Sequence, residues 1–236
     1  GLICFQRNKG ETIPGCIDTD VSPRDWDYCY DPLFIIGNQE KDAACSMCMT
    51  DTAGDVYVQW GRSDSCSNNH TTLYTGLVMA AYYKHSESDT LCVDPERATH
   101  AGSSDANDNG HLWYTTETQA GSIDEDLYPT DREVGCSVCL APKPVYVRWG
   151  SNSCPAQSSL LYKGIAAGSS SNEGGSVTTI CLHTSPQYPQ GFSDGNQDGN
   201  RLFGVEYEEY GTGIKHDTDA ACPVCSADID GDIYVQ

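Results

Sequence analysis

One alternating pattern of apolar and polar residues occurs three times along the chain. Residues 56–61 read Val-Tyr-Val-Gln-Trp-Gly, residues 145–150 read Val-Tyr-Val-Arg-Trp-Gly, and residues 233–236 begin the pattern again as Ile-Tyr-Val-Gln. β-branched and aromatic residues dominate each copy, which predicts a β-strand with one buried face. The central tyrosines lie 89 residues apart (57 to 146) and 88 residues apart (146 to 234), so the period is that of a small domain.

Further motifs follow each of the first two alternating strands in a fixed order. They are a cysteine, a Leu-Tyr-x-Gly run, a Leu-Cys or Ile-Cys run, an aromatic run and a Cys-x-x-Cys pair. Gly, Asn, Asp and Ser separate the runs, which favours strands joined by loops, and a helical turn or two is expected only near residues 76–83. We therefore predict an all-β fold, built as a tandem repeat of small disulfide-stapled β domains of about 88 residues. The predicted boundaries are 1–54 for a partial N-terminal repeat, 55–144 for the second repeat, 145–232 for the third, and 233–236 for the start of a further repeat or a donor strand.

The N-terminal repeat matches only the latter part of the other two. Its run Leu2-Ile3-Cys4 aligns with their Leu-Cys and Ile-Cys runs, and residues 44–48 align with their Cys-x-x-Cys pairs. It has no Val-Tyr-Val strand, and both ends of the sequence read as unfinished repeats. Cys16 and Cys29 have no counterpart in the other repeats, and we interpret their Pro- and Asp-rich segment as an inserted loop closed on itself.

These motifs, in this order, resemble a known family. The order Val-Tyr-Val-x-Trp-Gly, Cys154-Pro155, Leu-Tyr-x-Gly, Ile-Cys-Leu, Phe-Gly-Val-Glu-Tyr-Glu (203–208) and Cys-x-Val-Cys is similar to the non-collagenous domain of sponge short-chain (spongin-type) collagens and related invertebrate extracellular proteins. No Gly-X-Y run is present, so a collagen triple helix is not part of this sequence. The resemblance implies an extracellular structural or matrix protein whose globular units assemble with one another, and it implies no catalytic residues.

Thirteen cysteines in 236 residues are expected where disulfides persist, so we place the protein outside the cell as a secreted protein. A Cys-x-x-Cys pair also occurs in redox and zinc sites. However, 87 residues separate Cys48 from Cys136 and 82 separate Cys139 from Cys222, far from the roughly 15–20 of a zinc ribbon. No βαβ pattern of a thioredoxin type surrounds the pairs either. Structural disulfides are the favoured interpretation.

One pairing scheme makes all three repeats follow one rule. It joins Cys4 to Cys45, Cys92 to Cys136 and Cys181 to Cys222 within repeats, joins Cys48 to Cys66 and Cys139 to Cys154 across the junctions, and closes Cys16 on Cys29. Exchanging the two members of each Cys-x-x-Cys pair gives an equally regular scheme, and sequence alone does not decide between them. The favoured scheme leaves Cys225 unpaired or available for an intermolecular bond.

The chain is strongly acidic, with a net charge of −21 and a pI near 4.3, so nucleic acids and anionic membranes would repel it. No apolar run approaches the ~20 residues that span a bilayer, and we predict no membrane insertion.

No cofactor is expected to be required. Ca²⁺ is the candidate ligand, because three loops carry closely spaced carboxylate and amide oxygens, although Asp, Asn and Gly are also common turn formers. The loops are 105–110, 194–200 and Asp228-Ile229-Asp230-Gly231-Asp232.

Two further features bear on surface chemistry. Asn69-His70-Thr71 is an N-glycosylation sequon in a polar stretch, which predicts a glycoprotein. Trp26 and Trp113 lack counterparts in the other repeats and leave room for an aromatic sugar-binding face.

The histidines do not repeat between units, no Gly-x-Ser-x-Gly elbow occurs, and acids such as Glu206 and Glu208 cluster as an acidic chain does by chance, so we predict that the protein is not an enzyme.

The favoured function is an extracellular structural protein that assembles with itself, head to tail, into a filament or matrix. The N-terminal edge formed by Leu2, Ile3 and Phe5 would accept a donor strand formed by Ile233, Tyr234, Val235 and Gln236 of the next molecule, with Cys225 free to lock the joint. Two alternatives remain at this point. The sequence can be a window cut from a longer repeat array, or the protein can be a lectin-like adhesion protein that binds glycans or other matrix components.

Overall fold

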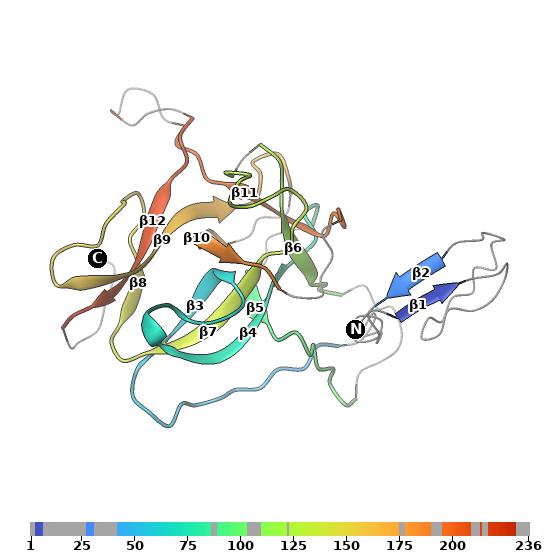
Figure 1. Ribbon diagram of the computed structural model, residues 1–236, viewed down its shortest axis with the longest axis horizontal. Coiled ribbons are helices and arrows are strands. Elements are labelled where there is room, and N and C mark those ends of the chain that lie inside the picture. The colour runs from blue at the N-terminus through green and yellow to red at the C-terminus, as the bar shows by residue number, and fades with distance from the viewer. Residues whose placement is uncertain are drawn as a thin grey trace. The chain divides into compact units, whose positions relative to one another are not determined.

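The computed structural model describes residues 3–6, 27–30, 42–85, 89–102, 110–121, 123–174, 178–189, 195–208, 213 and 217–229, with only the backbone described for 3–6 and 27–30. Twelve strands and one short 3₁₀ turn form in this part of the chain, which confirms the all-β prediction (Figure 1). Within it, no helix is long and apolar enough to cross a membrane. The elements are β1 (Ile3–Gln6), β2 (Asp27–Tyr30), β3 (Asp55–Arg62), η1 (Ser67–Asn69), β4 (Thr71–Ala80), β5 (Leu91–Val93), β6 (Tyr114–Thr118), β7 (Gly135–Ala141), β8 (Val145–Val147), β9 (Ser158–Gly168), β10 (Ile180–Gln187), β11 (Asn200–Gly204) and β12 (Ala221–Ala227).

The chain divides into two compact units. The first unit comprises residues 1–45 and 98–108, and the second comprises 46–97 and 109–236. In the first unit β1 pairs with β2 in an antiparallel hairpin that sets Cys4 opposite Cys29. The predicted strand at Ile3 is therefore confirmed. The interpretation of residues 27–30 as part of a loop is wrong, because they form the strand opposite β1. Leu2 and Cys16 lie outside the described residues.

The described residues of the second unit form a ten-stranded sheet in the order β10-β3-β7-β4-β6-β11-β9-β12-β8, with β5 added beside β4. Strand β10 pairs with β3 on one side and with β9 on the other, so the path from β10 through β3, β7, β4, β6, β11 and β9 closes on itself. Closure removes the free edges that an open sheet of these strands would carry.

Residues 55–141 (the first half, β3–β7) and 145–227 (the second half, β8–β12) form the same antiparallel pairings. In each half the Val-Tyr-Val strand and the Leu-Tyr-x-Gly strand flank the strand that carries the Cys-x-x-Cys pair. The cross-strand registers also agree: Tyr57↔Cys139 corresponds to Tyr146↔Cys225, Gly76↔Cys136 to Gly164↔Cys222, and Val78↔Cys92 to Ala166↔Cys181.

The two halves nevertheless share their hydrophobic cores. One cluster packs Val78 and Tyr128 of the first half against Leu182 and Leu202 of the second. The other cluster packs Tyr57 of the first half against residues of β9 and β12. Each half buries apolar surface that it could not bury alone, which is how small units of this length gain stability.

Four disulfides join the described residues, and each lies within one half. They are Cys66–Cys139 and Cys92–Cys136 in the first half, and Cys154–Cys225 and Cys181–Cys222 in the second. The predicted bonds Cys92–Cys136 and Cys181–Cys222 are confirmed. Glycine at the Leu-Tyr-x-Gly position makes room for them, because a Cβ at Gly164 would lie 2.3 Å from the Cys181 sulfur.

The predicted junction bonds Cys48–Cys66 and Cys139–Cys154 are wrong, and so is the prediction that Cys225 is unpaired. The Val-Tyr-Val strand pairs with the Cys-x-x-Cys strand of its own half, at the far end of that half's sequence. This pairing brings the cysteine that follows the Val-Tyr-Val strand beside the second cysteine of the same half. Cys66 therefore reaches Cys139, and Cys154 reaches Cys225.

Cys45 and Cys48 are free and exposed, which contradicts the prediction that both form disulfides and rules out the bond from Cys4 to Cys45. Their segment aligns in sequence with β7 and β12, whose cysteines are fully buried between two flanking strands. Residues 44–50 form no strand, and Met47 and Met49 are 100% and 93% exposed. No strand of the described part of the chain flanks this segment, and its apolar side chains are accordingly exposed.

His183 is a buried histidine at the contact between the two halves. Its ring stacks on Tyr162 with 4.6 Å between ring centroids, and its Nδ1 accepts a hydrogen bond of 2.8 Å from the Ser185 N–H. Burial, reinforced by the nearby Arg62 charge and opposed by Asp64, lowers the pKa of His183 to about 4. The neutral ring is therefore the form that this packing accepts.

We expect this histidine to make the fold acid-sensitive. The unfolded chain binds a proton at a pKa near 6.5 and the folded chain only near 4, so the stabilisation is complete above about pH 6.5 and is lost as the pH falls through 4. Between pH 7 and pH 4 the free energy of unfolding should fall by about 2 kcal/mol less for His183→Phe than for the wild type, after allowance for solvent screening. Thermal melting across this pH range measures the difference. His111→Gln, at an exposed position, is the matched control and should leave the wild-type slope unchanged. Parallel pH profiles for wild type and His183→Phe would contradict the assignment.

Candidate functional site

The contact between the two halves uses different surfaces of each. The first half contributes β3 and β6, and the second half contributes β10 and β11. Strand β10 runs parallel to β3 with Leu182 opposite Trp60, and β11 runs parallel to β6 with Leu202 opposite Thr118. We call the side of the first half formed by β3 and β6 its trailing edge, and the side of the second half formed by β10 and β11 its leading edge. The equivalent positions of the other half carry the same names.

Glu117 is the charged centre of this contact. It lies in β6 and is only 1% exposed. Its carboxylate accepts hydrogen bonds from the backbone N–H groups of Gln197 and Asp198, at 3.1 and 2.9 Å, from the loop that precedes β11. Burial raises the pKa of Glu117, and the two N–H donors oppose that shift. A buried carboxylate held by two backbone donors fixes the loop of one half on the strand of the other.

This geometry also gives a structural role to the acidic loop at 194–200, for which the sequence predicted Ca²⁺ as a candidate ligand. Residues 195–200 are described, and their backbone caps Glu117, while the Asp198 carboxylate pairs with Arg201. Arg201 in turn forms an ion pair of 2.9 Å with Glu173 and lies over the Tyr83 ring at 3.9 Å. Asp198 is therefore already engaged by an internal cation.

The second half has a trailing edge of the same construction. Glu206 occupies the position of Glu117: each forms an isolated antiparallel bridge, Glu117 with Glu133 and Glu206 with Asp219. The neighbouring backbone bonds agree as well, since Val134 N–H donates to the Thr116 carbonyl and Ala220 N–H donates to the Val205 carbonyl. Trp149 occupies the position of Trp60 but is 50% exposed, and Glu206 is exposed.

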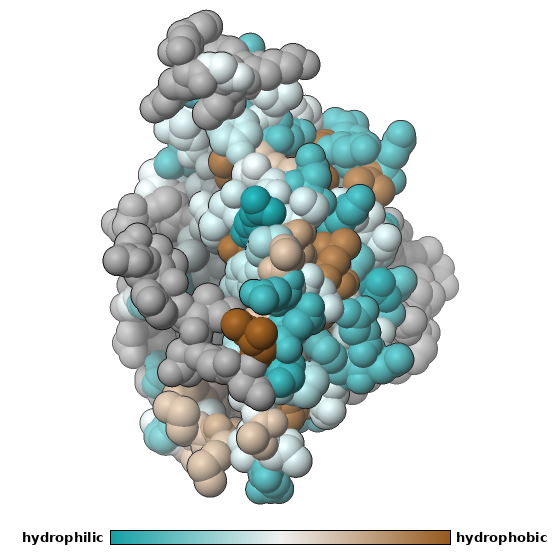
Figure 2. Space-filling view, turned by 90° about the vertical axis from the view of Figure 1, so that its left-hand side faces the viewer, coloured by the Kyte–Doolittle hydropathy of each residue, from teal (hydrophilic) through white to brown (hydrophobic). Residues whose placement is uncertain are grey.

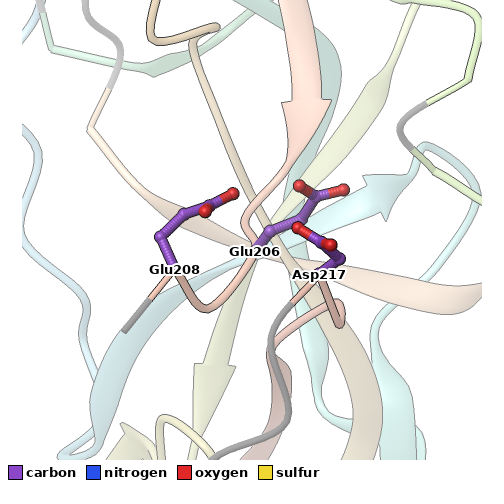
Figure 3. Close-up of side chains that lie close together, drawn as sticks. All are labelled: Glu206, Glu208 and Asp217. Atoms are coloured by element: carbon purple, nitrogen blue, oxygen red, sulfur yellow. The ribbon is translucent and has the colours of Figure 1, made fainter. Parts of the chain in front are cut away.

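An acidic cluster surrounds Glu206. One carboxylate oxygen from each of Glu206, Glu208 and Asp217 lies within 4.8 Å of the others, and all three side chains are exposed (Figure 3). A neighbouring shallow, open depression of about 420 Å³ is lined by Gly121, Ile123, Glu206, Asp217, Thr218 and Asp219. An all-oxygen donor set suits a hard cation such as Ca²⁺, although exposed acidic groups are common without one.

The predicted metal residues at the C-terminal end are not brought together by the described structure. Asp228 is exposed and its carboxylate accepts a hydrogen bond of 2.7 Å from the Ser159 hydroxyl. Asp230 and Asp232 lie outside the described residues, as do most residues of the loop at 105–110. Asp217 was not among the sequence candidates, because eight residues separate it from Glu208 and only the antiparallel return of the chain brings them together.

The glycosylation sequon and the tryptophans occupy the surface. Asn69 is exposed at the end of η1, where a glycan has access, and glycosylation stays a prediction. Trp113 is 37% exposed, whereas Trp26 lies outside the described residues. Figure 2 views the molecule from the side on which β8 and β12 lie in Figure 1, and hydrophobic side chains there occur in separate groups among hydrophilic ones.

Comparison of the chain with protein-family models finds no match, and comparison with curated proteins finds none either. The resemblance to the non-collagenous domain of short-chain collagens therefore stays an expectation from the motifs.

Proposed function

We propose that this protein is a secreted structural protein, built from tandem disulfide-stapled β-repeats, that assembles with itself head to tail into a filament or matrix. The observation that carries the proposal is the contact between its two halves. A contact between unlike surfaces of like units is heterologous, and such contacts propagate along an axis unless the rotation closes a ring. The second half ends in a trailing edge equivalent to the one that the first half has already used.

Three other features agree with this proposal. Four disulfides are compatible with an oxidising extracellular environment. A charge of −21 opposes close approach of copies, so salt or divalent cations would favour assembly by screening it. The acidic cluster at Glu206 is one place where a cation such as Ca²⁺ would reduce that repulsion.

Strand donation between molecules stays a prediction. Its proposed donor, formed by Ile233, Tyr234, Val235 and Gln236, lies outside the described residues, as does Leu2 of the acceptor. Ile3 and Phe5 lie in β1, which β2 already pairs on one side. The disulfide of Cys225 with Cys154 removes Cys225 as a covalent lock. Cys45 and Cys48 are the free cysteines of the described chain that remain for an intermolecular bond.

Sedimentation and negative-stain electron microscopy of the full chain test the proposal. We expect the mean particle mass to rise with protein concentration and with NaCl or Ca²⁺, and ordered linear particles to form. A chain that stays monomeric from micromolar to millimolar concentration at every salt level would refute self-assembly. Exposed Trp113 and Trp149 favour glycan binding as the second candidate, and a glycan array that gives strong, specific signals for such a monomer would support it.

A further inference from the structure

We propose that the trailing edge of the second half, formed by β8, Trp149 and Glu206–Tyr207, binds the leading edge of the first half of a second copy, formed by β5 and Trp113. This inference rests on the proposed self-assembly and specifies its interface. The contact reproduces between molecules the one that β3, Trp60 and Glu117 make with β10 and β11 inside the chain.

The Val-Tyr-Val strands show that the trailing edge of the second half lacks a neighbour among the described residues. Strand β3 runs from Asp55 to Arg62, and its last residues pair with β10 through Trp60 and Arg62. Strand β8 has the same sequence pattern but ends at Val147, before Trp149. It pairs only with β12 in the described structure. Strand β8 ends early, and no parallel partner pairs with it among the described residues. Ladder hydrogen bonds to such a partner are what extend a strand.

The turn that follows β8 already has the shape of its counterpart. Gly61 and Gly150 both adopt left-handed backbone conformations, with φ of +89° and +74°. The Gly150 N–H donates to the Ala221 carbonyl at 2.8 Å, and the Arg148 N–H donates to the Pro223 carbonyl at 3.0 Å. The trailing edge is therefore preorganised, which lowers the entropic cost of binding.

The leading edge of the first half likewise has no parallel partner strand among the described residues. Strand β5 occupies the position of β10, but β10 pairs with both β9 and β3, whereas β5 pairs with β4 alone in the described structure. By the shared register Val93 corresponds to Leu182 and Trp113 to Leu202. Leu182 and Leu202 are fully buried, while Val93 is only half-buried and Trp113 is 37% exposed.

The internal registers fix the expected geometry of the contact. Trp60 lies opposite Leu182, so Trp149 would lie opposite Val93 of the second copy. Thr118 lies opposite Leu202, so Tyr207, the counterpart of Thr118, would lie opposite Trp113 of the second copy. Two exposed tryptophans would then become buried in one contact, and aromatic residues of this kind commonly dominate interface energies.

A second copy is the occupant that the chain itself specifies, because both complementary surfaces belong to the same sequence. The two surfaces differ, so each copy keeps one edge open after pairing and the assembly extends. A two-fold dimer through identical surfaces is not expected from this contact.

Matched single substitutions at the two edges test the proposal in the full chain. Trp149→Glu disrupts the trailing edge and Trp113→Glu disrupts the leading edge. Each substitution should weaken self-association about tenfold or more, as measured by sedimentation. Each variant should keep the melting temperature of the wild type. A mixture of the two variants should give discrete dimers that do not grow further, because each variant keeps the edge that the other lacks. Leu160→Glu, at an exposed position of β9, is the control and should assemble normally.

Site-specific cross-linking provides a test that does not depend on the stability of a glutamate variant. A photo-cross-linking amino acid at position 149 should join to residues 91–93 of another copy, as mass spectrometry of mixed isotopically labelled chains would show. Assembly undiminished in both variants, or cross-links only elsewhere, would overturn this interface while leaving self-assembly intact. A wild type that never assembles would instead refute the proposed function.

Discussion

Reduction of the four disulfides is expected to abolish the cooperative fold of the second unit. The bonds close loops with sequence separations of 73, 44, 71 and 41 residues, and the chain-entropy model gives each about 4 kcal/mol. Domains of ordinary stability have only about 5–15 kcal/mol in total, so loss of two or more bonds removes most of it. Circular dichroism and tryptophan fluorescence with and without a phosphine reductant would measure the loss.

The free cysteines supply the internal control for that experiment. Iodoacetamide should label Cys45 and Cys48 in the native protein, whereas the eight bonded cysteines of the described chain should react only after reduction. The double variant Cys45→Ser/Cys48→Ser should keep the wild-type melting temperature and its sensitivity to reductant. A reduced chain that still melts cooperatively at the native temperature would contradict the assigned role of the bonds.

The sequence predicted the strands well because their signals are local. Alternation at residues 56–61 and 145–150 marks β3 and β8, and the Leu-Cys and Ile-Cys runs mark β5 and β10. The bonds Cys92–Cys136 and Cys181–Cys222 followed from a spacing that recurs in each repeat. The strand predictions needed only the identity and order of nearby residues, whereas for the cysteines the sequence also allowed a second, equally regular pairing.

The errors concern which strands become neighbours. The junction bonds Cys48–Cys66 and Cys139–Cys154 join cysteines that are close in sequence, whereas the actual bonds of Cys66 and Cys154 span about 70 residues. Strand pairing between the first and last strands of a half leaves no mark in the local pattern, since period and propensity do not specify a partner. The exposure of residues 44–50 has the same cause. Their local pattern resembles that of β7 and β12, but no described strand flanks them, so they form no strand.

The candidate site was predicted less well than the fold. Closely spaced oxygen ligands and turn formers have the same composition, so the loop at 194–200 could not be told from a cation loop until its backbone donors and Arg201 were located. Glu117 and Glu206 occupy equivalent positions, but one is buried and the other exposed. Among the described residues, the first half has β10 and β11 beyond its trailing edge, whereas no strand pairs beyond the trailing edge of the second half. The sequence repeat was the one signal that could have identified Glu117 and Glu206 as equivalent positions.

The Gly61→Ala substitution is expected to destabilise the fold by about 2–5 kcal/mol. Gly61 has φ of +89°, a conformation that costs an L-residue about 1–2 kcal/mol. A Cβ there would lie 2.1 Å from the Tyr128 hydroxyl. That hydroxyl is buried and donates a hydrogen bond of 2.7 Å to the His183 carbonyl, so it cannot move without losing a buried bond worth about 1–3 kcal/mol. For a unit of this size the melting temperature should fall by about 10 °C.

Gly150→Ala is the matched control, because it makes the same change at the equivalent position of the second half. Its φ is +74°, but its Cβ would meet only the Tyr207 hydroxyl at 2.8 Å beside an exposed turn, so the backbone cost of about 1–2 kcal/mol should dominate. The two losses, measured by chemical denaturation, should therefore differ by about 2 kcal/mol. In a Tyr128→Phe background the cost of Gly61→Ala should fall towards that of Gly150→Ala, since the clashing hydroxyl is gone. Equal costs at the two glycines in the wild-type background would show that Tyr128 does not restrain the turn, and that the glycine in both Trp-Gly motifs serves the backbone alone.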